Sequence, residues 1–189
     1  MAKKYEFKPD KPRSGLLNKL FLTRLQRRSL LKWTLYAIVL VVLSVLQDVI
    51  FSQVRLLGGT TELVVLGIFV ICLAEGVEKG SVFALVASFC YLFSGSAAGY
   101  YSVPFITGLA VLVTAFRQNF LQRSFGAAAL CTAFAMAAYE ILVFLITVFL
   151  GQTPWSGFYG AAVTAVMTMP AIFLIYPLCL LIGGNTWNE

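Results

Sequence analysis

The sequence predicts an all-α polytopic membrane protein, a bundle of six transmembrane helices with both termini in the cytoplasm. Hydrophobic residues make up 60% of the 189 positions and charged residues only 12%. A soluble domain of this length could not bury so much apolar surface, so lipid must surround much of it. Ten of the fourteen basic residues lie in the first 32 positions. This asymmetry predicts the orientation of the bundle.

Six apolar segments account for the predicted helices. Charged or turn-forming residues separate each segment from the next. The segments cover 33–49, 62–74, 80–96, 101–116, 125–150 and 158–182. Pro170 and Pro177 lie within the last segment, and each removes a helical hydrogen bond, so we expect the sixth helix to be kinked.

Two of these segments need a further argument. The second is short, because a span requires about 20 apolar residues, so we expect it to recruit flanking residues or to thin the bilayer. Residues 80–116 form an uncharged stretch of 37 residues. That stretch is too long for one helix across about 30 Å of hydrocarbon. The small residues at 94–99 therefore predict a turn that divides it into a helical hairpin.

The distribution of positive charge predicts which ends of the helices face the cytoplasm. Residues 1–32 carry ten basic and two acidic groups, whereas the remainder carries four basic and six acidic groups. With six spans, Lys79, Arg117 and Arg123 fall in cytoplasmic loops and only Arg55 lies outside. This arrangement satisfies the positive-inside rule.

The chain divides into three predicted parts: a basic cytoplasmic tail over 1–32, the transmembrane domain over 33–183 and a cytoplasmic C-terminal tail over 184–189. Residues 1–13 are rich in Lys and Pro and are expected to be disordered. Around 16–25, apolar residues recur at helical spacing among bases, which predicts a short interfacial amphipathic helix. The tail either serves orientation alone or also binds anionic lipids.

The residue inventory does not favour an enzyme. Histidine is absent, and the four cysteines are widely spaced inside predicted spans. Metal-ligand spacing, redox pairs and a phosphate-binding loop are not found in the sequence. We therefore expect no catalytic residues, no metal, no cofactor and no nucleic-acid partner.

Glu140 is the one ionisable residue expected deep inside a span, where a charge is expensive and commonly functional. Small residues share its predicted helix face and would allow another helix to approach closely. The face comprises Gly126, Ala129, Ala133, Ala137 and Glu140. No base is expected within the membrane, so Glu140 should be neutral and bonded to a hydroxyl of Thr107, Thr114, Thr164 or Thr168. Either helix packing or a ligand or partner contact explains the pattern.

A similar face of small residues occurs on the sixth segment, at Gly157, Ala161 and Ala165. Asp48 and Glu62 mark the outer ends of the first two spans, where interfacial capping is the expected role in preference to a functional one. Gly76 and Gly80 flank a cytoplasmic turn and are expected to serve that turn rather than packing.

The turn after the third segment has a distinctive composition. Small residues lead into two tyrosines and a proline, which suits docking of the extracytoplasmic part of another protein. The residues concerned are Gly95, Gly99, Tyr100, Tyr101 and Pro104.

These features together resemble the rod shape-determining MreD family over residues 35–183. The matching residues are Gly80, the turn at 92–99, Glu140-Ile141, Pro170 and Tyr176-Pro177. The family often carries an aspartate shortly before the Ser-Gly turn, whereas this chain has Cys90-Tyr91-Leu92 there. Any role of that acid in the family does not carry over.

The resemblance implies a non-enzymatic scaffold of the bacterial cell-elongation complex, supporting cell shape and peptidoglycan synthesis from the cytoplasmic membrane. The implied partners are MreC, MreB, RodA and a class B penicillin-binding protein. The MreD family is also similar to the six-helix S components of energy-coupling-factor transporters, so a subunit that binds a vitamin or other small molecule is the alternative. Such subunits tend to carry closely spaced small residues on the first span. Here Ala37 and Ser44 stand seven positions apart, which argues against transport.

Overall fold

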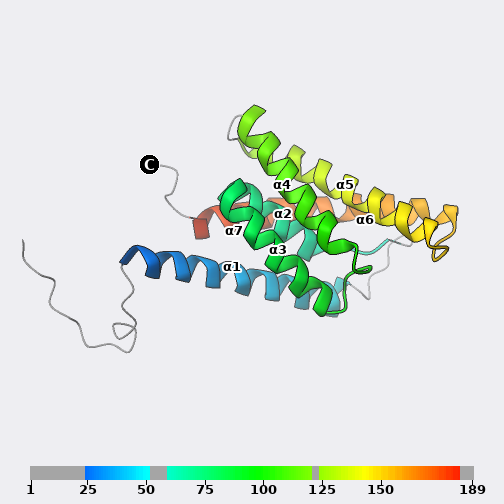
Figure 1. Cartoon of the computed structure of the whole chain (residues 1–189), viewed down its shortest axis with the longest axis horizontal. Helices are drawn as coiled ribbons and strands as arrows, with labels where there is room; N and C mark the ends of the chain where they lie inside the picture. Colours follow the sequence, from blue (N-terminus) through cyan, green and yellow to red (C-terminus); the bar gives the residue numbers. More distant parts are fainter. Residues whose placement is uncertain (1–23, 52–58, 121–123, 184–189) are drawn as a thin grey trace, which may run out of the picture.

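A computed structural model describes residues 24–51, 59–120 and 124–183 of the chain. The prediction of an all-helical bundle is confirmed over these ranges, and six helices are present when the bent last helix is counted once (Figure 1). They are α1 (Arg24–Val49), α2 (Leu63–Glu75), α3 (Val77–Phe93), α4 (Ser102–Phe120), α5 (Phe125–Phe149) and the last helix, made of α6 (Phe158–Thr168), η4 (Met169–Ala171) and α7 (Ile172–Gly183). A short 3-10 turn, η3 (Trp155–Gly157), precedes α6.

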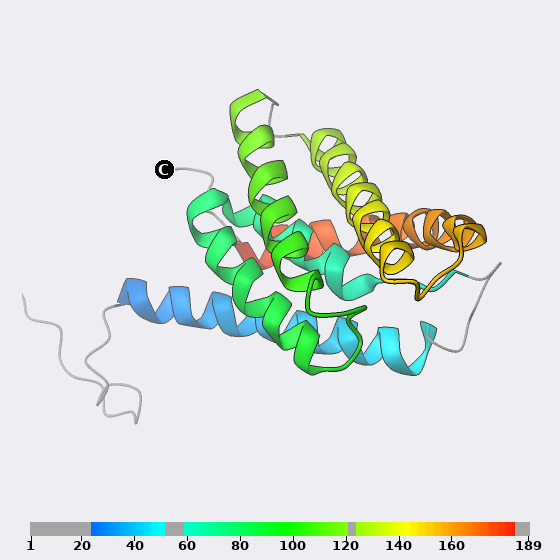
Figure 2. The ribbon, with the colours of Figure 1, turned by 45° about the vertical axis from the view of Figure 1, so that its right-hand side comes forward.

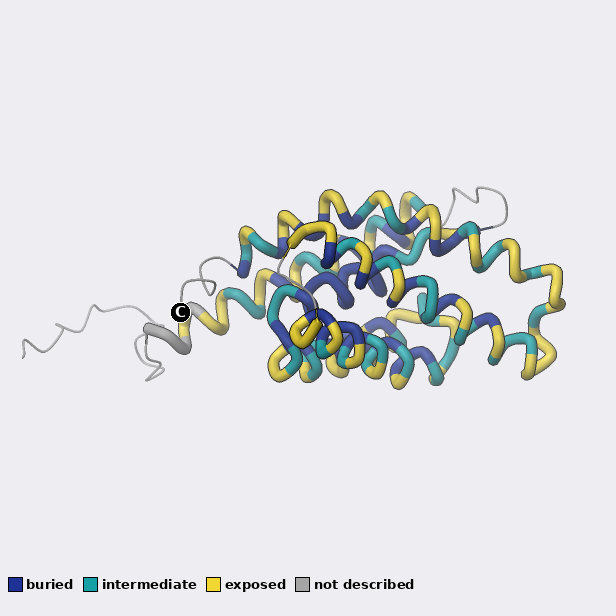
Figure 3. Tube along the Cα trace, turned by 90° about the horizontal axis from the view of Figure 1, so that it is seen from above, coloured by how far each residue is buried: buried dark blue, intermediate teal, exposed yellow. Residues whose placement is uncertain are grey.

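Four of the six helices are long and apolar enough to cross a membrane. They are Ser29–Val49, Ser102–Phe120, Phe125–Phe149 and Trp155–Gly183. Exposed residues line their outer faces and buried residues line the interior, as Figure 3 shows. Many of the exposed side chains are large and apolar, such as Val41, Leu130 and Leu174. Because exposed apolar surface of this extent requires lipid as solvent, the chain is a multi-pass membrane protein.

The second predicted segment forms the central core helix of the bundle. α2 has 13 residues, and every residue from Leu63 to Leu73 is buried. At 1.5 Å per residue it is about 20 Å long, shorter than the hydrocarbon layer. It contacts α1, α3, α4, α5 and α7, and its central position is visible in Figure 2. A helix that is apolar on all sides is stable when other helices surround it. Neighbouring helices therefore enclose α2 along its length.

Side chains from other helices satisfy the backbone where the chain enters α2. The N–H groups of Thr60 and Glu62 each donate to a threonine hydroxyl of α6, Thr164 and Thr168 respectively, both at 3.1 Å. The N–H of Val64 donates to Oε1 of Gln47 on α1, also at 3.1 Å. Irregular backbone and a helix N-terminus are tolerated inside a bundle only with such partners.

Glycines make the α2–α3 hairpin tight. Gly76, with φ +90°, forms the turn between the helices, as expected. Gly80 has a packing role, and the expectation that it serves only the turn is wrong. A Cβ at Gly80 would lie 3.0 Å from both Cα and O of Cys72. The backbones of α2 and α3 therefore meet directly at this position.

The two ends of the bundle contain different helix ends and turns. α1 begins and α7 ends at one end, where Tyr36 and Cys179 are in contact; we call it the termini end. The other end, which we call the turn end, holds the α3–α4 turn and the last residues of α1 (Figure 2). The common location of the helix termini agrees with an even number of spans. Which end faces the cytoplasm stays a prediction.

The helices differ from the predicted segments at α1, α3, α4 and the last helix. α3 (Val77–Phe93) begins and ends three residues before the predicted 80–96. α1 begins at Arg24, so the boundary expected at residue 32 lies within a continuous helix. α4 continues to Phe120 and includes Arg117, which was expected in a loop. The α-helix of the last span is interrupted at Pro170 by η4, whereas α7 continues through Pro177. The tails expected over 1–13 and 184–189 lie outside the described residues, as does all of the interfacial helix expected over 16–25 except its last two residues.

Candidate functional site

Two buried carboxyl groups lie close together in the half of the core near the turn end. Glu140 projects from α5 and is 7% exposed. Glu62 immediately precedes α2, and its side chain makes no capping hydrogen bond to that helix. The two groups are near enough for the charge of Glu62 to act on Glu140. Interfacial capping, the role expected for Glu62, is therefore wrong.

The hydroxyl group of Tyr139 lies in range of this acid pair, and the hydroxyl group of Ser102 lies beside Tyr139. Tyr139 on α5 is fully buried and Ser102, at the start of α4, is 1% exposed. The Tyr139 hydroxyl is near enough to interact with Ser102 and lies within electrostatic range of Glu62, Glu140 and Tyr91. We call Glu62, Ser102, Tyr139 and Glu140 the acid cluster. Helices α2, α4 and α5 bring it together.

Each member of the acid cluster has a buried oxygen without a hydrogen-bond partner. These atoms are Oε2 of Glu62, Oγ of Ser102, Oη of Tyr139 and Oε1 of Glu140. Glu62 as a residue is half-buried, but its Oε2 atom is shielded from solvent. Leaving a buried polar group unpaired costs about 1–3 kcal/mol, and more for a charged group. The cluster can therefore take up protons or bind a group that satisfies its oxygens.

Three of the four hydroxyl partners expected for Glu140 are engaged elsewhere. Thr164 and Thr168 donate to carbonyls one turn earlier in α6, at 3.0 and 2.7 Å, and they accept from the chain entering α2. Thr107 pairs with Ser88 at 3.2 Å. Oγ1 of Thr114, the fourth, is buried without a hydrogen-bond partner, as is Oε1 of Glu140. The expectation of a hydroxyl partner for Glu140 is therefore wrong over the described residues, and Thr164 and Thr168 instead satisfy the backbone at the entrance to α2.

The small-residue face of α5 is only partly packed. Gly126 is exposed, and a Cβ placed there would have no neighbouring atom within 4 Å. Ala129, Ala133 and Ala137 are half-buried. The buried face is a neighbouring one that includes Ala128, Cys131, Thr132, Ala135 and Tyr139. A close helix contact at Gly126 within the described chain is therefore wrong, and a partner contact on this face stays a prediction. Alanine is frequent on both faces, so its spacing could not distinguish them.

The small residues of η3 and α6 are better packed than those of the α5 face. A Cβ at Gly157 would lie 2.6 Å from Cγ2 of Thr153, Ala165 is 9% exposed and Ala161 is half-buried. The backbone of α6 also meets Gly59 closely. A Cβ at Gly59 would lie 2.9 Å from the backbone nitrogen of Thr164 and 3.1 Å from the carbonyl oxygen of Gly160.

The turn predicted at 94–99 is confirmed, and it extends to residue 101 between α3 and α4. Gly95 has φ +78°, and Gly99 lies against the ring of Tyr101. Tyr100 is 86% exposed, and Pro104 is also exposed. Oγ of Ser96 donates to Oδ1 of Asp48 at 3.0 Å. This bond attaches the turn to α1 and leaves Tyr100 available to a partner, whose docking stays a prediction.

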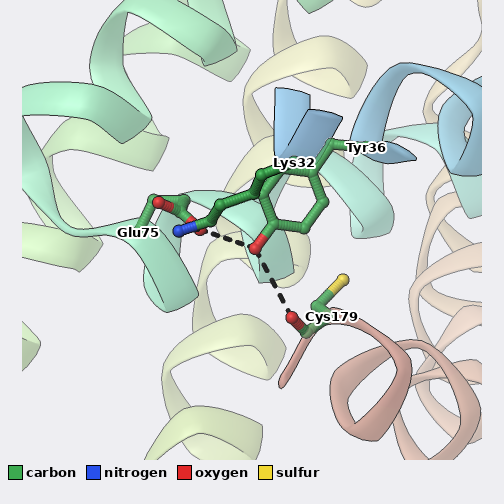
Figure 4. A network of polar contacts seen from close by, with 4 residues as sticks. All are labelled: Lys32, Tyr36, Glu75 and Cys179. Carbon is green, nitrogen blue, oxygen red and sulfur yellow. Dashed lines mark hydrogen bonds and ion pairs between the residues drawn. The ribbon is translucent and has the colours of Figure 1, made fainter. Parts of the chain in front are cut away.

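A second polar group joins the helices at the termini end, as Figure 4 shows. Oε1 of Glu75 lies 2.6 Å from Nζ of Lys32 and accepts a 2.6 Å hydrogen bond from the Tyr36 hydroxyl. The same hydroxyl lies 3.4 Å from the carbonyl oxygen of Cys179. We call Lys32, Tyr36, Glu75 and Cys179 the termini cluster. It connects α1, α2 and α7.

Arg117 is buried in the bundle, so its expected place in a loop is wrong. It is 5% exposed. Its guanidinium donates to the carbonyl of Leu73 at 3.0 Å and to Oη of Tyr176 at 3.2 Å. Leu73 lies in the last turn of α2, where backbone carbonyls have no partner within the helix. Arg117 therefore satisfies the C-terminus of the core helix, a role that its position after a long apolar run did not indicate.

No family model, curated protein or solved structure matches this chain. The fold and the buried groups define a multi-pass helical membrane protein with ionisable side chains inside its core. The described residues contain no group of three or more His, Cys, Asp or Glu suited to a metal ion.

Proposed function

We propose that the chain is a non-enzymatic membrane scaffold of the bacterial cell-elongation complex, located in the cytoplasmic membrane. The supporting observation is the placement of the residues that carry the MreD resemblance. Gly80 lies in a backbone contact, residues 92–99 lead through the α3–α4 turn, Glu140 is buried and Pro170 interrupts the last helix. Glycine stands where two backbones meet, small residues stand in a turn, and a proline stands where the helix is interrupted.

The turn end supplies a surface for the proposed partners. Tyr100 is 86% exposed and Trp155 is 72% exposed. Exposed aromatic residues are common anchors in protein interfaces. In this proposal the extracytoplasmic part of a partner such as MreC binds here, while MreB, RodA and a class B penicillin-binding protein complete the assembly. The N-terminal tail supplements this attachment by binding anionic lipids.

Depletion in the native bacterium tests the proposal. Loss of the protein should round the cells without abolishing uptake of any vitamin. Affinity purification from membranes should recover elongation-complex proteins, and a Tyr100→Ala, Trp155→Ala double variant should recover less of them. Normal cell shape together with a specific uptake defect would reject the scaffold.

A substrate-binding S component of an energy-coupling-factor transporter is the second candidate. The acid cluster favours it, because unpartnered buried oxygens can recognise a polar solute. α1 argues against it: the small residue Ala37 is exposed, but branched residues such as Ile38 and Val41 surround it. Recovery of an ATPase module in place of elongation proteins would favour the transporter.

A further inference from the structure

The acid cluster has more hydrogen-bonding capacity than the described chain uses. Four buried oxygens from four side chains lack partners. Buried polar groups in native proteins are rarely left unpaired, and each exception calls for a protein, water or ligand partner. The residues come from three separate helices, so one local distortion does not explain them all.

The charge at the cluster indicates the sign of the missing partner. No lysine or arginine of the described residues lies within electrostatic range of either carboxyl group. Of the other titratable groups, Tyr91 of α3 and Tyr139 of α5 lie within electrostatic range of both carboxyl groups, and Asp48 at the end of α1 lies within range of Tyr91. None of these can carry a positive charge. A neutral or anionic ligand would leave two adjacent acids uncompensated, whereas a cation would compensate them.

We propose that the acid cluster is a binding site for a small monovalent cation. The ligands are carboxylate oxygens of Glu62 and Glu140 and hydroxyl oxygens of Ser102 and Tyr139. Oxygen atoms are the ligands that hard cations prefer. When one of the two carboxyl groups keeps its proton, the other carries a single negative charge, which one monovalent cation neutralises. The cation therefore competes with a second proton for the pair. An alkali cation and the ammonium group of a small amine share this chemistry.

The position of the site gives the cation a structural effect. Glu62 directly precedes α2, Ser102 begins α4, and Glu140 lies within α5. A ligand held by all three elements stabilises the packing of α4 and α5 on the core helix. Binding should therefore raise the thermal stability of the folded protein.

Thermal unfolding of the full chain in detergent provides the test. The melting temperature is measured in sodium, potassium, methylammonium and choline chloride at one ionic strength, choline being the bulky control. We expect a saturable rise of roughly 3–6 °C over choline at ten times the Kd, from at least one small cation. Sodium or potassium as the strongest ligand identifies an alkali site, and methylammonium an amine site. Binding should also release protons into weakly buffered solution, because the cation displaces a proton from the pair.

Single substitutions locate the effect. Glu62→Gln and Glu140→Gln should each weaken cation binding by about 10–100-fold, because each removes a charged ligand. Tyr139→Phe removes one neutral oxygen and should weaken binding less. Glu78→Gln is the matched control, since Glu78 is exposed on α3 and its loss should leave binding unchanged.

Two results would overturn the proposal. One is an identical melting temperature of the wild-type protein in all four salts with no proton release. The other is an unchanged cation response in Glu140→Gln. If the glutamine variants fail to fold, the wild-type response and Tyr139→Phe still decide the matter. Because the readouts are melting temperature and proton release, they are independent of whether elongation proteins co-purify.

Discussion

The hydroxyl of Tyr36 donates a 2.6 Å hydrogen bond to the Glu75 carboxylate across 39 positions of sequence. Lys32, one helical turn before Tyr36, lies 2.6 Å from the same carboxylate oxygen. The first helix is thus attached to the end of the core helix by two polar contacts. α1 otherwise presents mostly apolar side chains to lipid, so these contacts contribute to its position in the bundle.

Tyr36→Phe should destabilise the protein while leaving it folded. A hydrogen bond to a charged group contributes about 1.5–3 kcal/mol, and removing it should lower the melting temperature by about 3–12 °C. Thermal unfolding in detergent measures the change. Tyr159→Phe is the matched control because Tyr159 is exposed, and an equal loss there would show that the bond to Glu75 is unimportant.

Gly80→Ala should weaken the α2–α3 hairpin by about 1–3 kcal/mol, because the added methyl group would overlap the backbone of Cys72. Gly108→Ala provides the control. A Cβ at Gly108 meets no atom within 4 Å, and alanine is the better helix former, so this variant should match or exceed the wild type in stability. The two free energies of unfolding are compared in denaturant. Equal effects of both substitutions would contradict direct backbone contact at Gly80.

Cysteine labelling tests the orientation of the bundle. In a background without the native cysteines, single cysteines at positions 97 and 155 should react with a membrane-impermeant reagent added to intact cells. Cysteines at positions 78 and 120 should react only after the cells are opened, because the positive charge of the N-terminal tail keeps the termini end inside. Labelling of residue 78 from outside would reverse the orientation.

Glu140→Gln should leave folding and partner pull-down nearly unchanged, because glutamine preserves the size of the side chain and its polar atoms. Glu140→Lys should disrupt both, since a cation at the centre of a span costs about 2.5–3.5 kcal/mol on insertion scales. The amount of monodisperse protein in detergent is the measurement. If lysine is tolerated as well as glutamine, Glu140 is in contact with water or lipid headgroups.

Much of the architecture could be predicted from sequence because it depends on local composition. Runs of apolar residues predict helices in lipid regardless of their neighbours, since the backbone there must satisfy its own hydrogen bonds. The turn at 94–99 was predictable from its small residues, and the interruption at Pro170 from the missing N–H. Glu140 also stood out in the sequence as a buried ionisable residue.

Tertiary structure decided how these segments are used. Enclosure by five other helices makes the apolar run of α2 the core of the bundle. Arg117 follows an apolar run like any loop residue, yet the free carbonyl of Leu73 and the Tyr176 hydroxyl draw it inside. The sequence by itself determined the six helices and their membrane setting. Only the fold brought Glu62 from the entrance of α2 to Glu140, because residues 78 positions apart become neighbours through packing and not through any local pattern.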